Sequence, residues 1–290
     1  MRNKKWPYLL LIALCQVVFV AYWAVNQIVA DTEAPKIAVD SQQLEVSVQD
    51  DKSVLLQGVT AMDNRDGDVT ASLLVENIRL LDTDGTVTVT YAAFDRAGNV
   101  AKAQRQVRYT DYESPKFTLS APLVFAQGSN FDVLNVIGAQ DVMDGNIQHR
   151  IRATSMDATS VSTLGSHEVQ FQVTSSLGDT AKEVFPVEVY AAGTYEAALT
   201  LTEYLVYVPV GTTFLAETYL KEFTLSQKTI SLTSGLPNGY SLRTSGRVNT
   251  NSPGVYSVGF TVTYTPENEG NTQMVRKYTG YSKLIVVVEG

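Results

Sequence analysis

The chain has 290 residues, 44% of them hydrophobic, so it can bury several cores and is not a disordered protein. Its formal net charge is −8, and because residues 1–30 hold three bases and no acid, the remainder carries −11. Such an acidic body repels phosphate backbones, and no basic cluster with interleaved aromatic residues offsets this locally. Nucleic acid is therefore excluded as a partner.

The first 30 residues predict a membrane anchor. An apolar run from Tyr8 to Val25 is interrupted only by Gln16, and a helix of this length spans about 27 Å, enough to cross the hydrocarbon of a bilayer. Aromatic residues flank the run at both ends, and every base precedes it. We expect residues 1–30 to be a cytoplasmic basic stub followed by a transmembrane signal anchor. The chain would cross the cell membrane once, with residues 31–290 extracellular.

A cleaved signal peptide is the alternative interpretation of this run. Signal peptides have shorter apolar regions, and Ile28 is bulky where a small residue is preferred before cleavage after Ala30. Cys15 does not resemble a lipidation site, because Leu14 precedes it and apolar sequence continues beyond it. Cys15 is also the only cysteine, so the exported part contains no disulfide. For an exported protein this is more typical of bacteria than of animals.

After Ala30 the sequence consists of short alternating apolar runs separated by Gly, Asn, Asp and Pro, which predicts an all-β structure. One strand recurs three times, starting at Gly85, Gly165 and Gly254. We expect its buried face to carry the same positions in each copy: Val89, Tyr91 and Ala93; Val169, Phe171 and Val173; Val258, Phe260 and Val262. Each repeat closes on a strand expected to alternate, "RQVRY", "FPVEVY" or "LIVVVE".

Repeats of about 80 to 95 residues with about seven short strands fit a two-sheet sandwich of immunoglobulin type. We therefore expect three tandem immunoglobulin-like β-sandwiches, at residues 31–112, 113–193 and 194–290, the last one divergent. The joins are only a few residues long, and Pro115 stiffens the first of them. The three domains are expected to form a rod with limited flexing.

The first repeat contains the segments "DTEAPKI", "GVTAMDNRDGDVT" and "GTVTVTYAAFDRAGNVAKAQRQVRY". Together they resemble the bacterial immunoglobulin-like domain named after a pesticidal crystal protein, which is common in Gram-positive surface and secreted proteins. The resemblance covers most of residues 33–110, is looser over residues 113–190, and keeps only the strand skeleton over residues 195–290. It implies a non-catalytic β-sandwich in a multidomain envelope protein, and little about the partner.

The acidic loop of the first repeat is the candidate metal site. Its oxygen ligands for calcium would come from two loops that meet at one end of the sandwich: Asp63, Asp66, Asp68, Asp95 and Asn99. The preferred interpretation is instead a turn at Asp66 and Gly67, in which Asp63 and Asp68 accept backbone hydrogen bonds. A helix-loop-helix calcium loop is excluded, because Met62 would occupy its first ligand position.

The other two repeats weaken this acidic pattern. The second keeps Asp141, Asp144 and Gly145 but has Asn146 in place of the last acid, so it should bind calcium more weakly than the first. The third repeat lacks the acidic loop and should not bind calcium. No other cofactor is expected.

No catalytic motif is present. The two histidines, His149 and His167, both lie in the second repeat, and His167 occupies a strand position held by Val87 and Tyr256 in the other repeats. The nucleophile motif Gly-x-Ser-x-Gly and a phosphate-binding glycine loop are both missing from the sequence. We expect a protein that is not an enzyme.

Two functions remain open. In the preferred one, the protein is a membrane-tethered structural or adhesive rod that presents a binding surface to the cell wall or to a protein partner. The alternative is an extracellular glycan- or ligand-binding module that its membrane helix merely localises. Glycan sites usually display exposed aromatic residues, but Trp6 and Trp23, the only tryptophans, both lie in the anchor.

Residues 195–290 are the candidate partner-facing end. The net charge is −6 for residues 31–111, −5 for residues 112–194 and zero for residues 195–290, which also hold nine of the 15 tyrosines. Tyrosine is favoured at interfaces because it offers a large area and a polar group. It is also a good strand former, and Tyr256 is expected to face the core.

Overall fold

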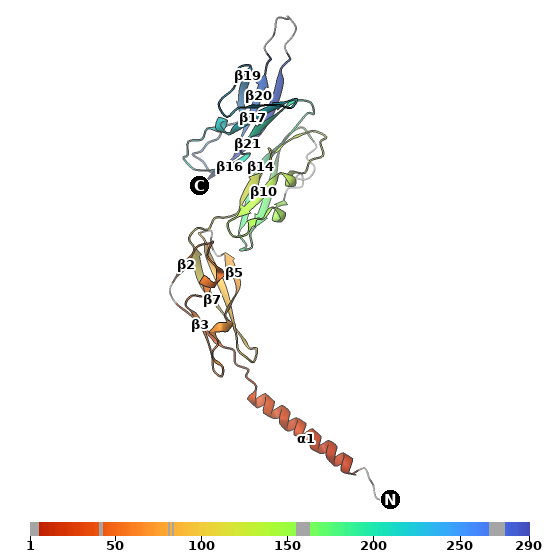
Figure 1. Ribbon diagram of the computed structural model, residues 1–290, viewed down its shortest axis with the longest axis vertical. Helices are drawn as coiled ribbons and strands as arrows, with labels where there is room; N and C mark the ends of the chain where they lie inside the picture. Colours follow the sequence, from red (N-terminus) through yellow and green to blue (C-terminus); the bar gives the residue numbers. More distant parts are fainter. Residues whose placement is uncertain (1–5, 41–42, 81, 83, 155–162, 267–275) are drawn as a thin grey trace. The chain divides into compact units, whose positions relative to one another are not determined.

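The chain is an all-β protein preceded by one helix, and it forms two compact units, Met1–Tyr112 and Glu113–Gly290 (Figure 1). The computed structural model describes residues 6–40, 43–80, 82, 84–154, 163–266 and 276–290. The predicted fold class is confirmed. The predicted boundary at residues 193 and 194 stays a prediction.

The helix α1 runs from Trp6 to Val29. Pro7 lies in its first turn, where the missing N–H removes no helical hydrogen bond. Over Trp6–Val25 the mean hydropathy is 2.2, and none of this window is buried against the rest of the described chain. In the described part of the chain, α1 is the one helix long and apolar enough to cross a membrane.

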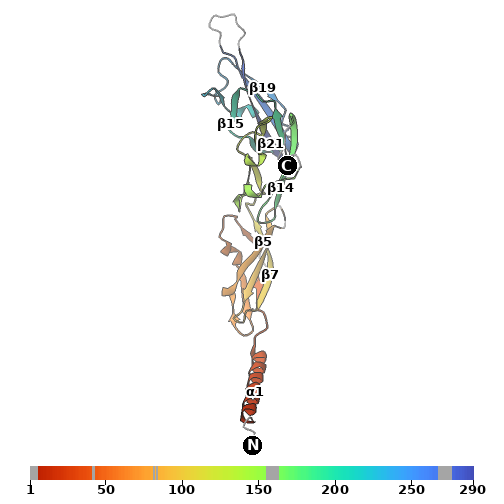
Figure 2. The same cartoon turned by 90° about the vertical axis from the view of Figure 1, so that its right-hand side faces the viewer.

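The first unit contains one sandwich, which we call the first sandwich (Figure 2). A three-stranded sheet in the order β1-β3-β4 consists of Lys36–Val39, Val59–Asp63 and Gly67–Asp68. A four-stranded sheet in the order β2-β7-β6-β5 consists of Leu44–Val46, Val100–Tyr109, Thr86–Phe94 and Leu74–Leu80. Two short 3-10 helices lie at Lys52–Leu56 and Thr70–Ser72.

The alternation of apolar residues places the core of the first sandwich between its two sheets. On β6, Val89, Tyr91 and Ala93 are fully buried, as the repeated strand pattern predicted. Tyr91 also needs a partner for its hydroxyl, which donates to the carbonyl oxygen of Leu55 at 2.8 Å. The Tyr91 hydroxyl therefore has a hydrogen-bond partner although the side chain is fully buried.

The second unit begins with the second sandwich. Its smaller sheet has the order β11-β10-β8, formed by Gly145–Asn146, Ile137–Asp141 and Lys116–Leu119. Its larger sheet has the order β12-β13-β14-β9, formed by Arg152–Ala153, Gly165–Thr174, Thr180–Tyr190 and Val124–Ala126. The 3-10 helices lie at Val133–Asn135 and Gln148–Arg150.

A seven-stranded sheet completes the second unit. Its order is β18-β17-β15-β21-β20-β19, and β16 also pairs with β21. These strands, taken in chain order from β15, are Ala197–Leu201, Leu205–Pro209, Leu220–Leu225, Lys228–Ser231, Tyr240–Ser245, Gly254–Tyr264 and Tyr278–Glu289. A 3-10 helix lies at Ala216–Tyr219. Both β15 and β16 run parallel to β21, one along its first half and one along its second.

The strand β21 belongs to two cores at once. Leu284, Val286 and Val288 lie in the core of the seven-stranded sheet. The residues between them, Ile285 and Val287, lie in the core of the second sandwich. The one-sided alternation predicted for "LIVVVE" is therefore wrong, because a strand between two cores is buried on both faces and carries a continuous apolar run.

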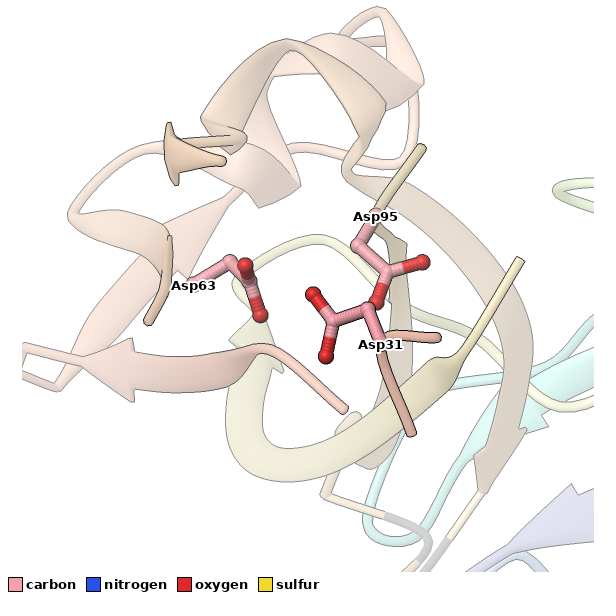
Figure 3. A group of neighbouring side chains, drawn as sticks. All are labelled: Asp31, Asp63 and Asp95. Carbon is pink, nitrogen blue, oxygen red and sulfur yellow. The ribbon is translucent and has the colours of Figure 1, made fainter. Parts of the chain in front are cut away.

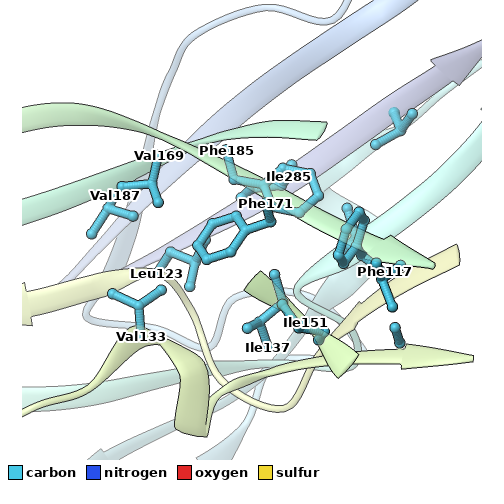
Figure 4. Packing of buried hydrophobic residues seen from close by; sticks show 14 of the residues in the cluster. Phe117, Leu123, Val133, Ile137, Ile151, Val169, Phe171, Phe185, Val187 and Ile285 are labelled. Carbon is cyan, nitrogen blue, oxygen red and sulfur yellow. The ribbon is translucent and has the colours of Figure 1, made fainter. Parts of the chain in front are cut away.

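Figure 4 shows Ile285 of β21 among the aromatic side chains of the second sandwich. Phe171 and Phe185 have ring centroids 6.0 Å apart, and Phe117 meets Phe185 edge-on at 5.7 Å. In the same unit, Lys283 pairs with Glu188 at 2.5 Å. The second sandwich and the seven-stranded sheet are thus joined by shared packing as well as by the chain.

Candidate metal centre

Three aspartates from separate segments meet at one end of the first sandwich. Asp63 ends β3 and Asp95 follows β6, while Asp31 precedes β1, whose Lys36 pairs with Met62 beside Asp63. One carboxylate oxygen from each of the three lies within 4.8 Å of the others. Figure 3 shows the three carboxylates turned toward a common space.

The two oxygens of Asp63 have different surroundings. Oδ1 accepts the N–H groups of Arg65 and Asp66, each at 2.8 Å, which fixes the turn. The N–H groups of Asp66 and then Arg65 lower the pKa of the Asp63 carboxyl below its ordinary value, so it is ionised at neutral pH. Oδ2 is buried and has no hydrogen-bond partner, in a residue only 8% exposed. One oxygen shapes the loop and the other is left without a donor.

Asp95 is positioned by Asn99. The N–H of Asn99 donates to Asp95 Oδ1 at 2.8 Å, and its side-chain amide donates to Asp95 Oδ2 at 2.7 Å. The same amide donates to the carbonyl oxygen of Asp31 at 3.1 Å. Asn99 therefore acts as a donor that connects two of the acids, and its amide nitrogen, not its oxygen, faces them.

The positive charge near the cluster is small. Arg65 Nε lies 3.9 Å from Asp31 Oδ2, and the Arg65 side chain is 49% exposed. At such exposure an ion pair contributes little, so the pairing of Arg65 with Asp31 does not offset three neighbouring carboxylates. The cluster has an excess of negative charge.

Asp66 and Asp68 accept backbone hydrogen bonds that fix the loop. Asp66 Oδ2 accepts the N–H of Arg96 at 2.7 Å and so links the two loops. Asp68 Oδ1 accepts the N–H of Thr70 at 2.9 Å. Between them, Gly67 has φ of 74°, which a side chain would strain. Of the five predicted ligands, the structure therefore brings Asp63 and Asp95 together, and it turns the other three to hydrogen bonding.

The sequence reasoning missed Asp31. A signal was present, because "DTEAPK" at Asp31 recurs as "DYESPK" at Asp111, each just before a first strand that pairs in the same register. Calcium binding by any of these residues stays a prediction at this point.

The second sandwich repeats the loop without a cluster of three acids. Asp141 Oδ1 accepts the N–H groups of Met143 at 2.9 Å and Asp144 at 2.7 Å, and Asp141 Oδ2 is buried without a partner. Ser175 stands where the first sandwich has Asp95, and its hydroxyl is also buried without a partner. Asn146 accepts the N–H of Gln148 at 2.9 Å, as Asp68 does for Thr70.

Asp111, which corresponds to Asp31, is used within the first unit. Its carboxylate accepts the hydroxyl of Ser47 at 2.7 Å and the N–H of Val48 at 2.8 Å. Those hydrogen bonds lower the pKa of the Asp111 carboxyl, the bond from Ser47 most. Asp111 is therefore committed to holding the end of β7 against the loop after β2.

The histidines do not form a catalytic arrangement among the described residues. His167 lies half-buried on β13, and its Nε2 contacts the carbonyl oxygen of Thr163 at 2.9 Å. His149 is exposed on a 3-10 helix. Among the described residues, no hydrogen bond joins either ring to a serine or a carboxylate, as a nucleophile and base would require.

The tyrosines of residues 195–290 are used mainly for packing. All nine are half-buried, and Tyr256 packs against the core as its register predicted. Tyr195 and Tyr281 stack with ring centroids 5.1 Å apart, and Tyr281 donates its hydroxyl to Glu188 at 2.8 Å. The proposal that these residues form a partner-facing end stays a prediction, and its tyrosine argument is weakened.

No protein-family model and no curated protein matches this sequence. Among solved structures, the chain is 18% identical to the CBM51-2 and INT domains of Clostridium perfringens ZmpB in complex with GlcNAc, at a TM-score of 0.22, covering 88% of this chain and 41% of that one. For the M60 catalytic domain with the CBM51-1 and CBM51-2 domains of the same protein, the identity is 11%, the TM-score 0.25, and the coverage 88% and 43%.

For a protocadherin gammaB7 EC3-6 cis-dimer the identity is 11%, the TM-score 0.20, and the coverage 89% and 74%. The chain spans about two fifths of the length of the Clostridium perfringens structures that it matches. These similarities are too weak to assign a function, and the sandwich fold rests on the strand pairing described above. The resemblance to the pesticidal crystal protein type of domain stays a prediction.

Proposed function

We propose that this chain is a non-catalytic extracellular protein tethered to the cell membrane by α1, with sandwiches that present a binding surface to the cell wall or to a protein partner. The observation that carries the proposal is the uncovered apolar surface of α1. Its side chains are more than half exposed at 14 large positions, such as Leu14, Val17 and Phe19. In water this surface would be costly, whereas a bilayer would cover it.

The length and the flanks of the helix support a span. A window of 20 residues rises about 30 Å, which matches the hydrocarbon thickness. Trp6 lies at one end and Trp23 near the other, at the depth of the two interfaces. A signal sequence shares these features, so cleavage is the outcome that the experiment must separate from anchoring.

A binding role is supported by how the polar groups are used. Most side-chain hydrogen bonds described above close turns or connect strands, and the histidines lie apart from nucleophiles. The acidic body also favours partners other than nucleic acid. The partner itself is to be identified by using the full-length chain in lipid nanodiscs as bait for envelope material. Capture of a glycan without protein would support the ligand-binding alternative.

Anchoring is tested by placing the same charge at two depths. Val17→Arg puts a guanidinium near the centre of the span, which costs about 2.5–3.5 kcal/mol, whereas Asn26→Arg places it one residue beyond the span, where it reaches the interface. We expect Val17→Arg to shift the chain out of the membrane fraction and Asn26→Arg to stay with it. Recovery of a wild-type species in the medium that begins at Asp31 would refute the anchor.

A further inference from the structure

We propose that Asp31, Asp63 and Asp95 bind a calcium ion and thereby tie the segment after α1 to the first sandwich. The three acids are the cluster described above, with one oxygen from each within 4.8 Å of the others. The proposal changes the ligand set predicted from sequence, because Asp31 enters it and Asp66, Asp68 and Asn99 leave it. Calcium binding itself does not depend on whether α1 spans a membrane.

One oxygen of Asp63 is without a hydrogen-bond partner. Asp63 Oδ2 is buried, it has no hydrogen-bond partner, and the residue is only 8% exposed. A buried charged oxygen without a donor is costly, and a row of neighbouring carboxylates increases that cost. A cation in the common space shown in Figure 3 would satisfy this oxygen and offset the repulsion with Asp31 and Asp95.

The ligand type and spacing of the cluster favour calcium over other divalent cations. An all-oxygen set selects a hard cation, and calcium takes 6–8 oxygens at about 2.3–2.6 Å. Two ligands on opposite sides of a calcium ion are therefore about 4.6–5.2 Å apart, which accommodates the 4.8 Å limit of the cluster. Magnesium requires about 2.0–2.1 Å and a near-ideal octahedron, and zinc prefers nitrogen and sulfur. Calcium fits this arrangement better than either.

Hydrogen bonds within the protein hold the three carboxylates in place. Asp63 is fixed by two backbone N–H groups and Asp95 by Asn99. Asp31 Oδ1 accepts the N–H of Glu33 at 3.2 Å, and the Asp31 side chain is only 11% exposed. The loops therefore do not need the ion in order to form, and little ordering opposes its binding.

The position of Asp31 gives the ion a mechanical role. Asp31 lies two residues after the end of α1 at Val29, whereas Asp63 and Asp95 belong to the sandwich. An ion bound to all three would fix the start of the sandwich at the exit of the helix. Only this consequence for a membrane protein rests on the proposed anchor.

The binding test compares one substitution at two equivalent positions in the full-length protein, purified in detergent and freed of metal. Asp63→Asn keeps the oxygen that accepts the two N–H groups and replaces the unpartnered one with an amide. Asp141→Asn makes the same change in the second sandwich. Calcium is titrated calorimetrically into each, and thermal melts are recorded with calcium, with magnesium and with chelator.

We expect the wild type to bind calcium and to melt at a higher temperature with it. The affinity should fall at least tenfold in Asp63→Asn and stay within about twofold of the wild type in Asp141→Asn, since calcium affinity follows ligand charge. Absence of any calcium response in the wild type would overturn the site, as would equal losses in the two variants. An equal response to magnesium would overturn the assignment to calcium.

The tether is tested separately with a protease that cuts after glutamate. Glu33 is exposed and lies between α1 and the first sandwich. Calcium should slow cleavage after Glu33 at least severalfold in the wild type and leave the rate in Asp63→Asn unchanged. Fragments are identified by N-terminal sequencing, so the result does not depend on membrane insertion. Cleavage of the wild type at the same rate with calcium and with chelator would refute the tether.

Discussion

The first and second sandwiches build their paired loops with the same bonds, but they place different charges beside them. In each, one aspartate closes the turn, Asp63 or Asp141, and another reaches the opposite loop, Asp66 or Asp144. The second sandwich forms these hydrogen bonds although it has Ser175 where the first sandwich has Asp95. The turn of the second sandwich forms with Ser175 in place of Asp95 and with Asp111, the counterpart of Asp31, bonded to Ser47 instead, so this turn does not require a cluster of three acids.

The two sandwiches also differ in where their cores come from. The first is enclosed by its own two sheets. The second takes Ile285 and Val287 from β21 and packs Tyr207 of β16 against the same cluster. The second sandwich therefore depends on residues that follow it by about a hundred positions.

Ile285→Ala should destabilise the second sandwich by about 2–5 kcal/mol, because it opens a cavity at a fully buried position. Amide hydrogen exchange of β13 and β14 should accelerate. Leu284→Ala is the matched control, since Leu284 is equally buried but points into the other core. Faster exchange in β13 for Leu284→Ala than for Ile285→Ala would contradict the shared core.

Asp144→Ala should cost about 2–3 kcal/mol, because several donors lose their acceptor together. Asp144 accepts the N–H of Ser176 at 2.6 Å, the hydroxyl of Ser176 at 2.7 Å and the guanidinium of Arg150 at 2.6 Å. The loss is measured from denaturant unfolding, with hydrogen exchange assigning it to the second sandwich.

Asp66→Ala, the equivalent change in the first sandwich, should cost only about 1 kcal/mol. Asp66 accepts one N–H from Arg96, and the Arg96 side chain, whose guanidinium lies 3.8 Å away, is 88% exposed. Exposed ion pairs of this kind contribute little. A loss as large as that of Asp144→Ala would mean that the two loops are equivalent after all.

The contribution of Asp144 to stability should depend on pH in a limited range. Burial raises the pKa of its carboxyl, but the hydrogen bonds from Ser176 and the contact with Arg150 outweigh this and leave the pKa below its ordinary value. A lowered folded pKa stabilises the protein above the unfolded value of about 3.9, and this contribution is lost as the pH falls through the folded value. The melting difference between wild type and Asp144→Ala should therefore be constant from pH 7 to about pH 5 and shrink below about pH 4.

The repeated strand was predictable because its pattern is local. Val169, Phe171 and Val173 alternate within five residues, and all are fully buried. The proximity of Asp63 and Asp95 could be predicted only on one condition. The loops after β3 and β6 had to lie at the same end of the first sandwich. Asp31 was missed because it lies outside the acidic loop and approaches only through the pairing of β1 with β3.

The role of β21 was missed for a different reason. Alternation indicates one buried face, and the continuous run "LIVVVE" lacks the alternation that "RQVRY" and "FPVEVY" show. A run that is apolar at every position indicates a strand covered on both faces. The core that covers the second face of β21 is formed by segments distant in the sequence. The sequence pattern does not show which segments these are.

The dual burial of β21 also sets the order in which the second unit can fold. Residues 284–288 follow every other strand of the unit in sequence, yet both cores need them. Until they are in place, the aromatic residues of the second sandwich and the inner face of the seven-stranded sheet stay open to solvent. Such contacts between distant segments form late, and a chain that waits for them is prone to aggregate. We expect the second unit to be most prone to aggregation in the interval between the synthesis of β9 and that of β21.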